Sequence, residues 1–267
     1  MKIFAIRDAS LDRSRDLAWL LYYESDKTFY IHINKSSDEW DTPLILSSFV
    51  KRGSYSLDSY SSSLWVEQRI IPPDRQNLGM ILKTNGLDEY DPFGLLMLSS
   101  GRCAQDDCFL VPLKSRSLPK DLEAILSNNI SGLIKNEDRS FVITNDGKIR
   151  YIDCDSFKNI LERSKQRLKC YYDRIVSLEK CPGGNALCCN GYEITSELVC
   201  RELSAIPFTE NDIITYIQNN LKDTSAASDL LGCTKQNVID LVKRGKLSPV
   251  VKTKNSFLFL QRDLQRT

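Results

Sequence analysis

The segment TSAASDLLGCTKQNVIDLVKRGKL, residues 224–247, contains two short apolar patterns with helical spacing, separated by a glycine. Asp223 or Thr224 can cap a first helix, and Gly232 can adopt the left-handed backbone conformation that ends it. Thr234 is a good N-cap for a second helix. The segment therefore predicts two short helices joined by a sharp turn.

The apolar residues of the two predicted helices are spaced so that the helices can pack on each other. They are Ala226, Ala227, Leu230 and Leu231 in the first helix and Val238, Leu241 and Val242 in the second. This packing leaves amide and basic side chains on the outer face of the second helix, which Gly245 ends. Such side chains can bond base edges in the major groove, while lysines and arginines further along meet phosphates. The candidate DNA-binding residues are Thr234, Lys235, Gln236, Asn237, Lys243, Arg244, Lys246, Lys252 and Lys254.

After Gly245, the sequence KLSPVVKTKNSFLFLQRDLQ predicts a strand, a turn, a second strand and a short helix, with Lys252 and Lys254 at the tip. Residues 224–264 resemble the small winged helix-turn-helix of excisionases and MerR-type regulators, through the successive motifs LLGCTKQ, KRGKL and QRDL. The resemblance implies a recognition helix and a basic wing that touches the DNA backbone. Asp240 departs from the family pattern, in which a polar or basic residue is commoner.

Charge is unevenly distributed along the chain, although the 267 residues contain 36 basic and 35 acidic side chains. Residues 1–112 hold 12 basic and 16 acidic residues, a net charge of −4, whereas residues 222–267 hold 9 and 4, a net charge of +5. A basic C-terminal part beside an acidic N-terminal part is expected when one module faces a polyanion.

The rest of the chain mixes predicted strands and helices, so we expect an α+β fold with three domains, 1–113, 114–207 and 208–267. Apolar runs predict strands at residues 2–6, 18–23, 27–33, 43–50 and 108–113. Helical spacing predicts helices at residues 61–70, 74–87, 121–134, 157–180, 196–205 and 209–221. The sequence NDGK within residues 140–157 predicts a β-hairpin.

Three segments in the first domain carry a second resemblance. These are DTPLILSSFVKRGSYS (41–56), VEQRIIPPDRQNLGMILK (66–83) and DPFGLLMLSSGRCAQDDCFLVPL (91–113). They are similar to the N-terminal subdomain of HipA-type kinase toxins, in which a PLSLS-like strand, a helix and a closing strand follow one another. The resemblance implies that residues 1–113 contact a separate kinase-like toxin or another protein. An ordinary small β-domain is the alternative.

The sequence does not provide a kinase active site, and we expect no enzyme activity. Kinase chemistry needs a catalytic Asp base and metal-binding Asn and Asp residues. The sole histidine, His32, lies in a predicted strand, and Lys135 occupies the position of the base relative to Ser140. Asp153 and Asp155 follow a predicted strand but form an isolated pair.

We expect no cofactor and no metal site, because the nine cysteines form no C-x-x-C pair and no histidine lies near them. The N-terminal sequence lacks the features of a secretory signal, and no apolar run approaches a membrane span, so we expect a cytoplasmic protein without a membrane partner. The sequence favours a DNA-binding transcriptional regulator with duplex DNA as the partner, and the second resemblance implies the regulatory or antitoxin-like component of a HipA-type toxin–antitoxin system. The alternative is a protein-interaction or immunity adaptor whose helical hairpin serves packing or protein contacts.

Overall fold

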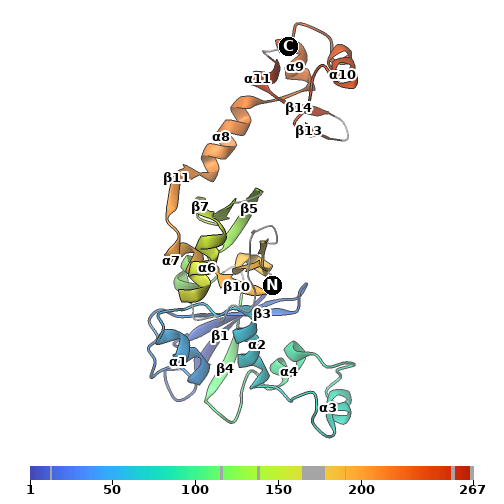
Figure 1. The fold of residues 1–267 in the computed structure, drawn as a ribbon. Helices are drawn as coiled ribbons and strands as arrows, with labels where there is room; N and C mark the ends of the chain where they lie inside the picture. Colours follow the sequence, from blue (N-terminus) through green and yellow to red (C-terminus); the bar gives the residue numbers. More distant parts are fainter. Residues whose placement is uncertain are drawn as a thin grey trace. The chain divides into compact units, whose positions relative to one another are not determined.

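The computed structural model describes residues 1–12, 14–114, 117–136, 139–163, 178–189, 191–253 and 256–264. The chain divides into two compact units, Met1–Ile206 and Pro207–Thr267 (Figure 1). Both units combine α-helices with antiparallel strands, which confirms the predicted mixed α+β class. Within the described residues, no helix has the length and apolar character needed to cross a membrane.

The first unit is built on a four-stranded antiparallel sheet in the order β3-β2-β1-β4. Its strands are β1 (Lys2–Asp8), β2 (Ala18–Tyr23), β3 (Thr28–Ile33) and β4 (Cys108–Leu113). Side chains on both faces of the central strands are buried, in two separate hydrophobic clusters. Burial on both faces explains why these strands are continuous apolar runs rather than alternating ones.

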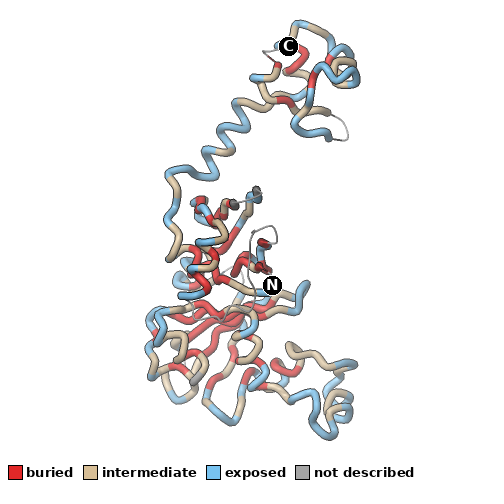
Figure 2. The backbone as a smooth tube through the Cα atoms, in the orientation of Figure 1, coloured by how far each residue is buried: buried red, intermediate tan, exposed pale blue. Residues whose placement is uncertain are grey.

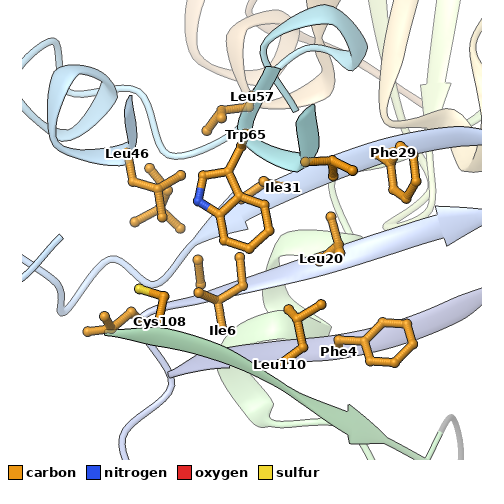
Figure 3. Close-up of a cluster of buried hydrophobic side chains, with 14 of the residues drawn as sticks. Phe4, Ile6, Leu20, Phe29, Ile31, Leu46, Leu57, Trp65, Cys108 and Leu110 are labelled. Carbon is orange, nitrogen blue, oxygen red and sulfur yellow. The ribbon is translucent and has the colours of Figure 1, made fainter. Parts of the chain in front are cut away.

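Helices cover one face of this sheet and close the larger cluster around Trp65 (Figure 3). They are α1 (Leu44–Val50), α2 (Ser59–Glu67) and α4 (Pro92–Leu98), whereas α3 (Leu78–Thr84) has no buried residue and contributes no side chain to the cluster. The predicted strand at residues 43–50 is wrong, because this segment forms α1. Leu46 is buried, and Ile45, Phe49 and Val50 pack against the same cluster. Their positions follow the period of a helix, which an eight-residue apolar run conceals.

The remainder of the first unit packs side chains such as Leu122 and Ala186 against the other face of the sheet, and most of its other elements surround a separate hydrophobic core. Its elements are α5 (Lys120–Leu126), β5 (Ile130–Asn136), β6 (Arg139–Thr144), β7 (Lys148–Ile152), α6 (Cys154–Arg163), β8 (Glu179–Lys180), the 3-10 turn η1 (Pro182–Gly184), β9 (Ala186–Cys189), β10 (Tyr192–Thr195), α7 (Ser196–Glu202) and β11 (Ala205–Thr209). Sheets form in the orders β10-β9-β8 and β11-β7-β6-β5. The predicted hairpin is confirmed as β6 and β7.

Two predicted helices in this region need correction. The helix expected over 121–134 ends with α5, and its second half forms β5 instead, because Asn129 is held in a turn by distant residues. The helix expected over 157–180 begins earlier, at Cys154, and its last two residues form β8. Residues 164–177 of that prediction lie outside the described residues.

A buried network of polar side chains joins the first sheet to the rest of the unit. Asn185 is its centre, with Oδ1 2.9 Å from His32 Nε2 and Nδ2 donating to the Tyr23 hydroxyl at 2.8 Å. Asn129 Nδ2 also donates to Asn185 Oδ1, at 3.1 Å, and Ser196 donates to Asn129 Oδ1 at 3.2 Å. Buried polar groups need such partners, so these bonds determine how the segments pack.

The second unit contains one long exposed helix followed by a small helical and β module. Its elements are α8 (Glu210–Asn220), β12 (Leu221–Asp223), α9 (Thr224–Leu230), α10 (Lys235–Lys243), β13 (Val251–Lys252), β14 (Phe257–Leu260) and α11 (Gln261–Leu264). The three strands form an antiparallel sheet in the order β12-β14-β13. No residue of α8 is buried, and the helix is largely pale blue in Figure 2.

The buried histidine predicts a pH-dependent stability. Burial lowers the pKa of His32 from 6.5 to about 4, although its hydrogen bond with Asn185 opposes the shift. Between these two values the unfolded chain binds a proton that the folded chain does not, so stability falls as the pH is lowered. We expect the free energy of unfolding of the first unit to drop by about 2 kcal/mol between about pH 7 and pH 5. Urea unfolding at both pH values measures this free energy. An equal free energy of unfolding at the two pH values would contradict the lowered pKa of His32.

The turn at Pro182–Gly184 predicts a strict need for glycine. Gly184 has a φ of 71°, and a Cβ atom there would lie 2.0 Å from the Ile130 carbonyl oxygen. Gly147 has a φ of 77°, with nothing within 4 Å of an added Cβ. Gly147→Ala should therefore cost only about 1–2 kcal/mol of backbone strain. We expect Gly184→Ala to cost more than about 3 kcal/mol or to prevent folding. Equal thermal stability of the two variants would refute this.

Candidate nucleic-acid interface

The two short helices α9 and α10 begin and end as the sequence predicts. Asp223 caps α9, since its carboxylate accepts the Ala226 N–H at 2.7 Å, and Gly232 follows the helix with a φ of 61°. Thr234 caps α10, since its hydroxyl accepts the Asn237 N–H at 3.3 Å. Both caps satisfy donors that a helix start leaves open, so each helix has a defined first turn.

A small core holds the helices against the three-stranded sheet. Its buried side chains are Ala227, Val238, Leu247, Phe259 and Leu264. Leu231, Leu241 and Val242 pack around them, as the sequence predicts. Leu230 was expected in this core but is 51% exposed at the end of α9.

Side chains also connect α9 to the strands. The Thr224 hydroxyl accepts the N–H of Phe257 at 3.1 Å and lies 3.1 Å from the Ser256 hydroxyl. β12 pairs with β14, so the strand that precedes α9 lies beside the strand that precedes α11. The helices and strands of this module therefore form one packed body.

The face of α10 opposite the core carries polar and charged side chains in mutual contact. Val238 is the one described residue of α10 that is fully buried, and Gln236, Asp240 and Lys243 follow one another at helical spacing on the other side. Gln236 Nε2 donates to Asp240 Oδ1 at 3.3 Å, and Lys243 Nζ lies 3.9 Å from the same oxygen. Asp240 thus restrains two of the predicted DNA-contacting side chains, which the sequence analysis did not foresee.

The other predicted residues are placed as follows. Lys235, Asn237, Arg244, Lys246 and Lys252 are exposed, on α10, on the turn after it and on β13. The Thr234 hydroxyl is occupied by its capping bond, so this residue positions the helix rather than offering a free hydroxyl. Lys254 lies outside the described residues. The sequence spacing of i and i+4 on a helix would have indicated the Gln236–Asp240 pair.

One of the two aspartates considered for catalysis, Asp153, has a structural role. Asp153 Oδ1 accepts the N–H of Ser156 at 2.8 Å and its hydroxyl at 2.6 Å, which starts α6. These bonds lower the pKa of Asp153. Asp155 lies in the first turn of the same helix. Among the described residues, no three His, Cys, Asp or Glu side chains are grouped so that they could hold a metal ion.

Comparison with known proteins adds no relative. No protein-family model matches the chain, and neither the curated proteins nor the solved structures provide a match. The function is therefore inferred from the geometry and chemistry of the residues themselves.

Proposed function

We propose that the second unit is a winged helix-turn-helix that binds duplex DNA, and that the protein is a DNA-binding regulator. The observation that carries this proposal is the exposed surface of α10, where amide and cationic side chains lie opposite the core. In such a module α10 is the recognition helix, and Gln236 and Asn237 at its start read base edges. β13 and β14 form the wing.

Electrostatics support the same assignment. Residues 222–267 carry a net charge of +5, and the exposed lysines and arginine follow α10 into β13. Cations spread over a helix end and a neighbouring strand can contact phosphates while the start of the helix faces the bases. A positive module also attracts a polyanion over distances longer than the contacts themselves.

Asp240 sets the strength expected of this binding. Its carboxylate holds Gln236 and is near Lys243, so DNA contact must compete with these bonds. The carboxylate also repels phosphates. We therefore propose binding of moderate affinity, in which the Gln236 amide breaks its hydrogen bond with Asp240 and bonds a DNA base instead.

A second candidate function, protein contact, is favoured by α8. Ile214, Tyr216 and Ile217 are 43%, 52% and 44% exposed on this helix, which contains no basic residue. Exposed apolar side chains at such density are typical of protein-binding surfaces. The HipA-like resemblance of residues 1–113 likewise implies a protein partner. In a purely adaptor protein, the charges on α10 and β13 would be dispensable.

The DNA proposal predicts a salt-dependent affinity that depends on two exposed lysines. Each phosphate contact contributes about 0.9 to the slope of log K against log salt. Lys246→Gln with Lys252→Gln should therefore reduce the slope by about 2, equally for all sequences. The control is Lys27→Gln with Lys148→Gln, which removes two exposed lysines from the first unit. Fluorescence anisotropy with a labelled duplex measures the slope for both double variants. A slope for Lys246→Gln with Lys252→Gln that equals the wild-type slope would reject the assignment of β13 and β14 as a wing.

Asp240 predicts a gain of affinity on neutralisation. Asp240→Asn keeps the size of the side chain but removes its negative charge, and we expect duplex DNA to bind about three- to tenfold more tightly. Asp229→Asn, on the exposed surface of α9, is the matched control and should change affinity less. Weaker or unchanged binding by Asp240→Asn would show that α10 does not face the DNA.

Asn237 predicts sequence preference. A bidentate amide contact with adenine discriminates against other bases by roughly 1–3 kcal/mol. Asn237→Ala should therefore relax the motif selected from random duplexes at one position, while affinity for non-specific DNA stays within about twofold. Selection of the same motif by Asn237→Ala and by the wild type would exclude this side chain as a reader.

A further inference from the structure

The first unit contains a pocket of about 630 Å³ that the DNA-binding proposal does not use. Its walls come from the end of α1, the start of α2, the end of α6, and β10 with α7. Small-molecule sites in proteins have volumes of several hundred Å³. The pocket is therefore large enough for a compact organic ligand.

Three arginines line this pocket, and one carboxylate serves two of them. Glu202, behind the lining, accepts from Arg163 Nη1 at 2.6 Å and from Arg201 Nε at 3.1 Å, and these bonds lower its pKa. Arg201 Nη1 also donates to the Gly53 carbonyl at 2.8 Å, which fixes its direction. Two guanidinium charges thus share one negative charge, and both side chains remain 71% and 44% exposed.

The third arginine, Arg52, adds a further positive charge. Its guanidinium lies 5.8 Å from the centroid of the Phe49 ring, and among the described residues it forms no ion pair. Two carboxylates also line the pocket, and they keep their negative charge because the donors that hold them are uncharged. Glu193 accepts the N–H and hydroxyl of Ser59 at 2.8 and 2.6 Å, and Asp58 accepts the Ser61 N–H at 2.7 Å.

Aromatic rings complete the lining. Phe49, Tyr60 and Tyr192 contribute rings, and Tyr60 is 71% exposed at the pocket. Guanidinium groups bind phosphate oxygens with paired, charge-assisted hydrogen bonds, and exposed rings stack on planar groups. We propose that this pocket binds a small phosphorylated molecule with a planar organic part, such as a nucleoside monophosphate. Arg52, Arg163 and Arg201 hold the phosphate, and the rings contact the base.

Calorimetric titration of the full-length protein with AMP, GMP, CMP and UMP tests this proposal. At least one nucleotide should bind with a Kd of about 0.1 mM or tighter, whereas adenosine and inorganic phosphate should each bind at least about tenfold more weakly. If adenosine bound as tightly as the nucleotide, the arginines would not bind the phosphate as proposed. If inorganic phosphate bound as tightly as the nucleotide, the rings would not bind the base as proposed. No heat with any of the four nucleotides would overturn the proposal.

Variants locate the site. Arg52→Gln with Arg163→Gln should weaken nucleotide binding at least about tenfold, because two of the three cations are lost. Arg102→Gln is the matched control for Arg52, since Arg102 also lies over a phenylalanine ring, 5.0 Å from that of Phe109, outside the pocket. Thermal unfolding without ligand confirms that the double variant folds. Binding equal to the wild type in a folded double variant would exclude this pocket.

Discussion

The side-chain amide of Asn185 is the interaction on which the first unit depends. Three segments distant in sequence meet at this one group, through His32, Tyr23 and Asn129. The two glycines before Asn185 allow it to enter, since a side chain at Gly183 would overlap the Tyr23 hydroxyl. Satisfied buried bonds of this kind specify one packing arrangement, because any alternative leaves polar groups unpaired. The positions of α2 and β10, which line the pocket, depend on that packing arrangement.

The second unit uses a different solution, in which a small core leaves most side chains exposed. Five buried side chains cannot cover more than one face of α10, so its polar face is free for a ligand. In our proposal, the positive charge of this unit serves DNA binding rather than folding. Surface cations away from carboxylates add little to stability, whereas they strongly affect binding to a polyanion.

Local signals in the sequence were sufficient for much of the architecture. Caps at Asp223 and Thr234, the turn within NDGK and the apolar runs of β1 to β4 each act over a few residues, and the structure has them where the sequence predicts. The error over residues 121–134 arises where distant contacts override local preference, whereas the strand expected at residues 43–50 was wrong because its apolar run conceals the period of a helix. Asn129 ends α5 through bonds with Gly183 and Asn185, more than 50 residues away.

The candidate sites show the same division. The residues of α10 are adjacent in sequence and could be predicted, and the i, i+4 spacing of Gln236 and Asp240 would also have indicated their contact. Arg52, Arg163 and Arg201 are spread over 150 residues and share no motif, so only the fold brings them to one pocket.

Amide hydrogen exchange of the full-length protein, with and without a duplex at about 50 mM salt, tests the DNA-binding assignment most directly. The duplex should slow exchange at residues 232–246 and 250–259 and leave the β1–β4 sheet unchanged. Slowed exchange confined to the first unit, or no change at α10 under conditions where the duplex is bound, would contradict it.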